Sequence, residues 1–345
     1  MTSSVRLAID AMGGDYGPRV TVPAAADFLS RNPSVRISLF GDEAQIHACL
    51  KKLSSPCERL SVVHCEQQVD NDEKPSQALR QKRDSSMWRA ISAVEQGDAD
   101  ACISAGNTGA LMAMGLIQLR LYPGIERPAI CAALPALKRR TYLLDAGANL
   151  DCTPQQLHQF AAMASCLVRT LDSIDSPQVG LLNVGSEDQK GAQCVRDAAE
   201  LLAEDGAINY QGFVEGDDVY KGTTDIVVCD GFNGNVALKA GEGVARMIAE
   251  RLRAAFKRTW YTRLVGALAK PVLLHFRNSI DPAQYNGASF LGLRGIVVKS
   301  HGSACQLAFA QALQVAFEEA QAGLSRQIEQ AFASASEDDG NPATD

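Results

Sequence analysis

The stretch Ile9-Asp10-Ala11-Met12-Gly13-Gly14-Asp15-Tyr16-Gly17-Pro18 decides how the beginning of this chain folds. It follows the apolar run Val5 to Ile9 and precedes a helix-like segment from Val20 to Leu29. A strand that ends in glycines and aspartates and leads into a helix is typical of a ligand-facing turn in an α/β sheet, because backbone N–H groups there can approach an anion. The stretch matches neither G-x-G-x-x-G nor G-x-x-x-x-G-K-[ST], which disfavours a dinucleotide or P-loop site.

Short β-branched runs alternate with helical patterns along the rest of the chain. The expected strands cover residues 35–40, 60–64, 99–104, 130–134, 141–144, 179–183, 225–229 and 296–299. The expected helices cover residues 76–95, 108–119, 154–171, 187–203 and 303–332. This rhythm predicts an α/β architecture with a three-layer, mostly parallel sheet. We expect residues 1–333 to form a single domain and the acidic stretch 334–345 to be a disordered tail.

Residues 244–278 break this rhythm, because they hold two helical patterns with no strand between them. The second pattern bends near Pro271 and is the richer in apolar residues, among them Trp260, Leu264, Leu268 and Leu273. We expect a helical hairpin that projects from the sheet domain. Its aromatic residues and flanking cations are typical of a helix in a membrane interface. An apolar face buried against a second copy of the chain is the alternative, and one hairpin could do both.

The composition excludes several classes of protein. With 345 residues, of which 46% are hydrophobic, the chain can bury a large core. No apolar run reaches the roughly 20 residues of a transmembrane helix, and no secretory leader is visible, so we expect a soluble, cytoplasmic protein. The net charge of −7 disfavours nucleic-acid binding. Residues 246–277 nevertheless carry eight Lys/Arg and one acid, which indicates a partner surface.

The ten cysteines have no C-x-x-C spacing. Several of them lie singly within apolar runs, where a free thiol behaves as a small buried hydrophobe. We therefore expect reduced, structural cysteines in a reducing compartment. Because histidines and cysteines are not clustered at metal-ligand spacing, we expect neither a metal nor another cofactor.

Four later motifs join the opening turn in forming a recognisable series. They are Ser104-Ala-Gly-Asn-Thr-Gly-Ala-Leu111, Leu143-Leu-Asp-Ala-Gly-Ala-Asn149, Val228-Cys-Asp-Gly-Phe-Asn-Gly-Asn-Val236 and Val298-Lys-Ser-His-Gly302. In this order the five motifs resemble the bacterial phosphate acyltransferase family of phospholipid synthesis, and they span nearly the whole chain. That family makes acyl phosphate from inorganic phosphate and acyl-[acyl-carrier-protein]. Two turns depart from its pattern, since Phe213 and Asn286 stand where many members have Asn and Gly.

The resemblance implies a fold similar to isocitrate dehydrogenase and phosphotransacetylase, and a reversible transfer of long-chain acyl groups to phosphate. It implies acyl carrier protein and inorganic phosphate as substrates, and a homodimer at the inner face of the membrane. The product would pass to a membrane glycerol-3-phosphate acyltransferase.

The chemistry of acyl transfer to phosphate explains which residues are candidates. Phosphate is itself the nucleophile, so the site needs hydrogen-bond donors and cations rather than an acylated side chain. Such groups follow the ends of the expected strands. The candidate catalytic residues are Lys190, His301, Lys299 and Asn235. The candidate substrate-binding residues are Asp10, Gly13, Gly14, Asp15, Asn107, Thr108, Asp145, Asn149, Asn183, Glu187, Asp230, Asn233 and Lys239.

Each of these candidates also has an ordinary structural interpretation. Thr108 could meet an anion or merely cap the helix that it begins. Lys190 is expected in a first helical turn, where the dipole disfavours a cation, so it suggests a nearby anionic ligand or a surface salt bridge. His301 has an ordinary pKa near 6.5, so it could protonate the leaving thiolate, bind phosphate or be structural. Asp10 and Asp230 could orient donors or cap turns.

Three cations near residue 80 are candidates for docking the acidic carrier protein: Arg80, Lys82 and Arg83. A solvated helix face is the ordinary interpretation of the same pattern. Two other functions remain open. One is a neighbouring enzyme, either a short-chain phosphotransacetylase or a dehydrogenase whose aspartates hold Mg²⁺. The other is a membrane scaffold without activity that binds the carrier protein.

Overall fold

The computed structural model describes residues 4–53 and 58–338 of the chain. It contains an eleven-stranded sheet with the order β3-β2-β1-β4-β11-β10-β5-β6-β9-β7-β8. The strands are β1 Val5–Asp10, β2 Val35–Gly41, β3 Leu60–His64, β4 Ala101–Ser104, β5 Ala129–Leu134, β6 Thr141–Leu144, β7 Gln178–Leu182, β8 Asn209–Val214, β9 Ile226–Val228, β10 Ala288–Leu291 and β11 Ile296–Lys299.

The strand directions divide the sheet into two parallel groups. Strands β1, β2, β3, β4 and β11 run parallel to one another, and so do β6, β9, β7 and β8. Between the groups, β10 is antiparallel to both β11 and β5, and β5 is antiparallel to β6. The prediction of a mostly parallel sheet is therefore confirmed. The two groups run in opposite directions, so the carboxyl ends of one group lie beside the amino ends of the other.

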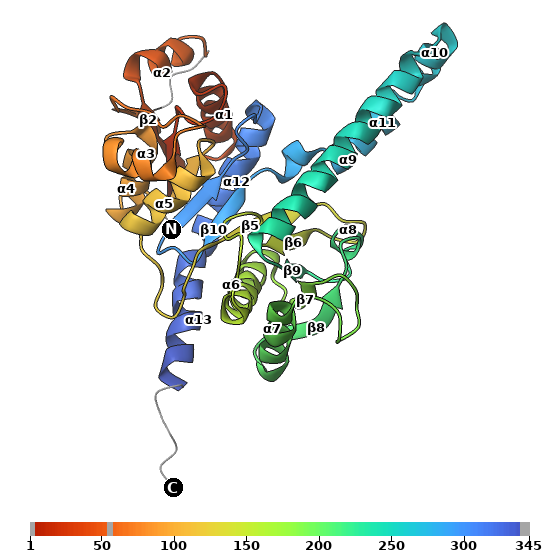
Figure 1. The fold of residues 1–345 in the computed structure, drawn as a ribbon. Helices are drawn as coiled ribbons and strands as arrows, with labels where there is room; N and C mark the ends of the chain where they lie inside the picture. Colours follow the sequence, from red (N-terminus) through yellow and green to blue (C-terminus); the bar gives the residue numbers. More distant parts are fainter. Residues whose placement is uncertain (1–3, 54–57, 339–345) are drawn as a thin grey trace.

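Helices cover both faces of this sheet, as the predicted three-layer architecture requires (Figure 1). They are α1 Pro18–Arg31, α2 Glu43–Leu50, α3 Pro75–Gln81, α4 Ser86–Glu95, α5 Thr108–Gln118, α6 Pro154–Asp172, α7 Gln193–Glu204, α8 Asp218–Lys221, α9 Gly231–Lys257, α10 Trp260–Leu268, α11 Lys270–Ile280, α12 Gln306–Ala322 and α13 Leu324–Asp338, with a 3₁₀ turn η1 at Pro282–Tyr285. Alternate residues of β1 face opposite layers. Leu7 and Ile9 pack with α1 and α12, whereas Ala8 packs with α4 and α5.

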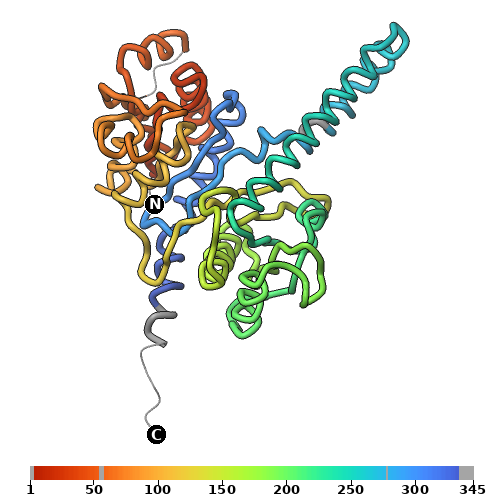
Figure 2. Tube along the Cα trace, viewed as in Figure 1, coloured from red at the N-terminus to blue at the C-terminus, as the bar shows by residue number. Residues whose placement is uncertain are grey.

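The expected helical hairpin projects from the body of the molecule (Figure 1 and Figure 2). Its first arm is α9, and α10 and α11 return beside it, with a break at Ala269 just before Pro271. Trp260 and Leu268 are 78% and 77% exposed. The first arm begins at Gly231 and not near residue 244, so the Asp230–Asn235 motif forms its first turn. None of the described helices is both long and apolar enough to cross a membrane.

Several predicted boundaries are wrong, and local capping explains most of the shifts. The helix expected at 76–95 is divided, because Ser85 caps a new helix by accepting a hydrogen bond from Trp88 N. The helix expected at 303–332 ends at Gly323, which has φ +69°. Strands β8 and β10 were not predicted. Helix α13 runs to Asp338 and so includes residues 334–338 of the expected tail, while residues 339–345 lie outside the described residues.

The helix expected at 187–203 begins instead at Gln193, with Ala192 as its N-cap residue. Lys190 therefore lies in a turn that precedes α7. Its charge thus does not oppose the dipole of that helix.

We predict that Glu319 makes the stability of this fold depend on pH. Glu319 of α12 is 1% exposed and hydrogen-bonds to the hydroxyl of Ser289 in β10. Burial raises the pKa of Glu319 to about 8. The ordinary pKa of a glutamate is about 4.3. The stability that Glu319 contributes is therefore complete below about pH 4.3 and is lost as the pH rises through 8.

The substitution Glu319→Gln should therefore stabilise the protein at pH 8.5, by on the order of 2 kcal/mol, and change it little at pH 5. Urea unfolding between pH 5 and 8.5 measures the difference. Glu95, which is exposed at the end of α4, provides the control variant Glu95→Gln. Equal loss of stability with pH in the parent and in Glu319→Gln would contradict this prediction.

Candidate functional site

Asp10, at the carboxyl end of β1, joins three segments beneath the glycine turn. Its carboxylate accepts hydrogen bonds from the hydroxyls of Ser86 at 2.6 Å and Ser104 at 2.7 Å, and from Met12 N at 3.3 Å. The Ser104 hydroxyl in turn accepts from Gly106 N at 3.0 Å. Burial raises the pKa of Asp10. These contacts fit the hypothesis that Asp10 orients donors, and the two serines are residues that the sequence analysis did not single out.

The glycine turn after Asp10 needs both of its glycines. A Cβ at Gly13 would lie 2.7 Å from Asp10 Oδ2 and from Gly106 N. Gly14 has φ +87°, which side chains rarely adopt. The next residue, Asp15, donates its backbone N–H to Gly302 O at 2.8 Å. The turn after β1 therefore packs directly on the turn after β11.

The start of α5 is capped by Asn107 and not by Thr108. Asn107 Oδ1 accepts from Ala110 N at 2.9 Å, and its Nδ2 donates to the carbonyls of Asn71 and Glu73. Its amide is thus occupied within the protein. Asn71 also donates to Asp15 Oδ1 at 2.9 Å, which closes the 71–73 segment over the site. Thr108 is exposed, and its hydroxyl has no hydrogen-bond partner among the described residues.

Lys299 and His301 follow β11 at the same edge of the sheet. The Lys299 ammonium donates to Ala105 O at 3.4 Å and to the carbonyl of Ser300. Burial lowers the pKa of Lys299 to about 8, although the nearby Asp10 acts in the opposite direction. Lys299 is half-buried, and its ammonium donates to two backbone carbonyl oxygens. An anion at this place could form stronger, charge-assisted hydrogen bonds with the Lys299 ammonium than the carbonyl oxygens do.

Lys239 reaches the same place from α9. Its Nζ lies 3.3 Å from His301 Nε2 and 2.9 Å from Glu242 Oε2. Burial, and then the positive charge of Lys239, lower the pKa of His301. His301 Nδ1 lies 2.9 Å from the hydroxyl of Ser303. Lys239 Nζ and the backbone N–H of Ser303, which lies 3.2 Å from Nδ1, can both only donate, whereas a neutral imidazole has a single accepting nitrogen. The two contacts therefore compete for one lone pair, and Nε2 accepts from Lys239 in the tautomer that carries its proton on Nδ1.

Asp145, after β6, fixes the loop that ends at Asn149. Its carboxylate accepts from the backbone N–H groups of Ile130, Gly147, Ala148 and Asn149, and from Asn149 Nδ2 at 2.9 Å. Burial raises the pKa of Asp145. Asn149 Nδ2 also donates to Pro128 O at 2.8 Å. Both predicted substrate-binding side chains are therefore used to hold the loop.

Asp230 is the N-cap residue of α9, as the ordinary interpretation of that aspartate held. It accepts from Asn233 N at 2.8 Å and from Asn233 Nδ2 at 2.6 Å. A Cβ at Gly234 would lie 1.9 Å from Asp145 O, so only glycine permits this approach of α9 to the loop. Asn235 is exposed and lies against Gly147, where its side chain remains free among the described residues.

The predicted residues after β7 form a self-contained turn. Lys190 pairs with Glu187 at 2.8 Å, and both side chains are more than half exposed. Asn183 Nδ2 donates to Lys190 O at 3.0 Å. Among the hydrogen bonds and ion pairs of the described residues, none joins this turn to Lys239, Lys299 or His301. The structure thus supplies the surface salt bridge that was the alternative interpretation of Lys190.

The predicted docking cations lie at the end of α3 and in the segment between α3 and α4. Arg80 and Arg83 are exposed and Lys82 is half-buried. The Arg83 guanidinium lies over the Trp88 ring at 5.6 Å from its centroid. Pro75, at the start of the same helix α3, would contact a side chain placed at Gly109 in the first turn of α5.

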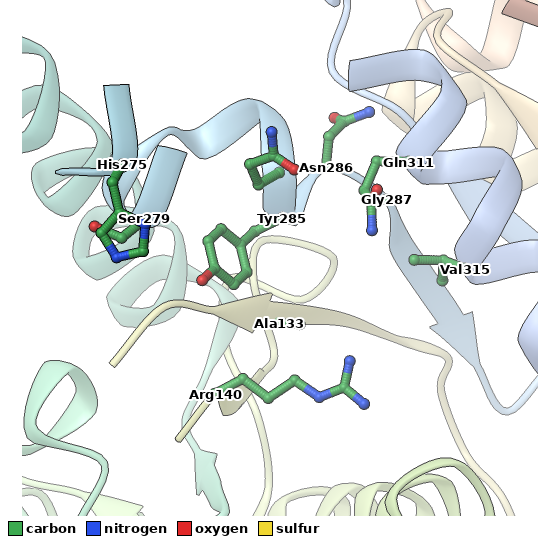
Figure 3. Close-up of a pocket in the computed structure, with 10 residues that line it drawn as sticks. Ala133, Arg140, His275, Ser279, Tyr285, Asn286, Gly287, Gln311 and Val315 are labelled. Atoms are coloured by element: carbon green, nitrogen blue, oxygen red, sulfur yellow. The ribbon is translucent and has the colours of Figure 1, made fainter. Parts of the chain in front are cut away.

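A cavity of about 500 Å³ lies between α11, η1, β5 and α12 (Figure 3). Lys239 and Lys299 are not among its lining residues, but Asn286 is, and Asn286 accepts a hydrogen bond from the backbone N–H of His301. In residues 4–53 and 58–338, no group of three or more His, Cys, Asp or Glu side chains is arranged to hold a metal ion.

Comparison with known proteins places the chain in a family. A family model described as "Fatty acid synthesis protein" matches residues 5–327. The chain is 53% identical over 324 residues to a phosphate acyltransferase of Methylococcus capsulatus, covering 93% of this chain and 95% of the relative. It is 51% identical over 331 residues to a phosphate acyltransferase of Alkalilimnicola ehrlichii, covering 96% of each.

A solved phosphotransacetylase from Streptococcus pyogenes has a similar structure, with a TM-score of 0.62 and 19% sequence identity. The match covers 92% of this chain and 94% of that one, and it confirms the predicted phosphotransacetylase-like fold. The two relatives are identical to this chain at about half of the aligned residues over nearly its full length. This agrees with the resemblance that the five motifs carry. The chain therefore belongs to the fatty acid synthesis protein family, together with the phosphate acyltransferases.

Proposed function

We propose that this chain transfers a long-chain acyl group, reversibly, from acyl carrier protein to inorganic phosphate. A phosphate oxygen forms the new bond to the thioester carbonyl carbon, and the C–S bond breaks. The products are an acyl phosphate and the carrier thiol. The observation that carries the proposal is the meeting of Lys239, Lys299 and His301 beside the glycine turn Gly13-Gly14.

In this proposal Lys299 binds phosphate beside the glycine turn. Burial strengthens the attraction between Lys299 and an anion, because little water competes for it. Lys239 faces the reacting thioester and supplies a proton to the departing thiolate. His301 accepts a hydrogen bond from Lys239 and so orients its ammonium. The free amide of Asn235 is available to donate to the thioester oxygen.

The contacts also bear on the alternatives. Aspartates that hold Mg²⁺ need free carboxylate oxygens, whereas Asp10 and Asp145 are buried and accept several protein hydrogen bonds each. This disfavours the dehydrogenase. A scaffold without activity has no need for a half-buried lysine whose pKa is lowered to about 8. A short-chain phosphotransacetylase would use the same donors, so only substrate tests separate it.

Purified protein, given palmitoyl-carrier protein with and without phosphate, provides the test of this function. We expect thiol release that requires phosphate, and an acyl product that hydroxylamine traps. Acetyl-CoA and NADP with an oxidisable substrate are run in parallel. Turnover of acetyl-CoA alone would support the short-chain enzyme, and tight carrier binding without any turnover would support the scaffold.

The acid–base behaviour of Lys299 gives a pH prediction. Its ammonium is present below pH 8 and is lost as the pH rises through that value, so the KM for phosphate should rise above pH 8. The variant Lys299→Gln should have a KM at pH 7 raised by about tenfold or more, the size expected for a lost charge-assisted hydrogen bond. Relative to the parent, its KM should no longer rise around pH 8.

Initial rates at pH 6.5 to 9.5 measure this effect, with Lys52→Gln on the exposed surface as the control. The ionisation of phosphate itself affects the KM of the parent and of the variants equally, so the difference between them reports on Lys299. If the parent and Lys299→Gln show the same pH dependence, Lys299 does not bind phosphate.

We propose that the exposed cations at the end of α3 and before α4 steer the carrier protein to the site. Acyl carrier proteins are acidic, and complementary charge raises the rate of encounter. The substitution Arg83→Glu should raise the KM for palmitoyl-carrier protein several-fold at low salt and leave the KM for phosphate unchanged. Kinetics at two salt concentrations measure this, and a KM for the carrier that does not change would rule out this surface.

The hairpin is the second proposed partner surface. Its tip exposes Trp260 and Leu268 beside Arg263 and Lys270, which suits a membrane interface. The same apolar face suits a second copy of the chain, and a homodimer could use one part while the tip meets lipid. At the inner membrane face, the enzyme could pass its acyl phosphate to a membrane glycerol-3-phosphate acyltransferase.

The variant Leu268→Glu separates these two roles, because it places a charge on the hairpin tip. We expect loss of co-sedimentation with anionic lipid vesicles while the molar mass in solution stays that of the parent. Leu137, which is 88% exposed and outside the hairpin, provides the control Leu137→Glu. Unchanged sedimentation with a smaller molar mass would instead assign the tip to the dimer.

A further inference from the structure

We propose that Asn286 is a positioning residue that holds His301 against Lys239. The inference deepens the proposed function, because it concerns the group that orients the proton-donating lysine. Asn286 lies in the short segment between η1 and β10, outside the five motifs that indicated the family.

The amide of Asn286 makes three hydrogen bonds, each to a different residue. Its Oδ1 accepts from the backbone N–H of His301 at 2.9 Å. Its Nδ2 donates to Ser300 Oγ at 2.8 Å and to Ala308 O at 2.7 Å. The backbone N–H of His301 can only donate and the carbonyl of Ala308 can only accept, so the orientation of the amide is unambiguous.

These bonds link three elements at the end of β11. His301 follows that strand, Ala308 lies in the first turn of α12, and Asn286 precedes β10. Gly287 reinforces the arrangement, because it has φ +116° and its Cβ position lies 2.9 Å from the Cα of Ala312. The backbone beside Asn286 is thus pressed against α12, and the side chain has little freedom to follow a shifted histidine. Figure 3 shows Asn286 and Gly287 near Gln311 of α12 at the cavity wall.

The histidine ring is held on two further sides. Ser303 meets Nδ1 through both its hydroxyl, at 2.9 Å, and its backbone N–H, at 3.2 Å. Lys239 meets Nε2 at 3.3 Å. Glu242 of α9 also pairs with Lys239, and Lys299 and Asp15 are the other charged groups that act on the ring. Two hydrogen bonds hold the histidine's backbone: Asn286 Oδ1 accepts from its N–H, and Ala304 N donates to its carbonyl at 3.0 Å. Losing Asn286 frees the N–H side, which lets the ring move away from Lys239.

The substitution Asn286→Ala should lower kcat by about tenfold, the effect of one misplaced hydrogen-bonded group, and change the KM for phosphate by less than twofold. The pKa of His301 should rise by several tenths, because the ring moves away from the charge of Lys239. Proton NMR titration of the histidine C2–H signals measures that pKa, with His301→Gln identifying the signal. The titration needs no turnover, so it tests the positioning even if the acyl-transfer proposal fails.

The control is Asn32→Ala, which removes a comparable bond from an asparagine amide to a backbone carbonyl, at the end of α1. In the His301→Gln background, Asn286→Ala should lower kcat no further, which a general loss of structure would not explain. An unchanged pKa of His301 overturns the proposal. So does a further decrease in kcat of about tenfold when Asn286→Ala is added to His301→Gln. If Asn286→Ala does not fold, Asn286→Asp retains the acceptor for His301 N–H. It should keep kcat within about threefold, and a loss equal to that of His301→Gln overturns the proposal.

Discussion

The close approach of α9 to the carbonyl of Asp145 is the constraint on which the site depends. Gly234 permits this contact, because any Cβ there would lie 1.9 Å from the Asp145 oxygen. Gly231 N donates to Asn149 O at 2.7 Å in the same contact. The first turn of α9 is therefore fixed on the loop after β6. A rigid helix then carries Lys239 to the far side of the sheet, where it meets His301.

This helix overcomes a difficulty that the sheet itself creates. The two parallel groups of strands run in opposite directions, so their carboxyl ends cannot form one site by adjacency alone. Helix α9 begins at the end of β9 in one group and contacts the end of β11 in the other. The same helix continues into the projecting hairpin. Any partner of the hairpin thus acts on an element that also carries a site lysine.

The acidic residues near the site do not conflict with anion binding. Asp10 and Asp145 are buried, and their carboxylates are satisfied by hydroxyl and N–H donors from several segments. Each holds a glycine-containing loop in place. Lys239 and Lys299 remain as the cations that face the site. Negative charge therefore shapes the backbone, while positive charge stays available to the substrate.

The sequence by itself determined the fold class, the family and most of the strands. Strand periodicity and the glycine motifs are local features, so patterns at β1, β4, β6 and β11 could be read from neighbouring residues. The hairpin and its bend near Pro271 were likewise visible as an interruption of the α/β rhythm. The motif order was sufficient for the family, because it does not depend on how the elements meet.

Only the tertiary structure decided which candidates come together. Lys239 and His301 are neighbours because α9 crosses the sheet, whereas Lys190 lies in a separate turn before α7. The predicted helix boundary that had made Lys190 attractive is wrong, since α7 begins at Gln193. Asn286 was noted only as a departure from the family's pattern, because the hydrogen bonds that it makes to Ser300, His301 and Ala308 could not be read from the sequence. Hydrogen bonds between distant segments leave no periodic trace in a sequence, so the site could not be assembled from its motifs alone.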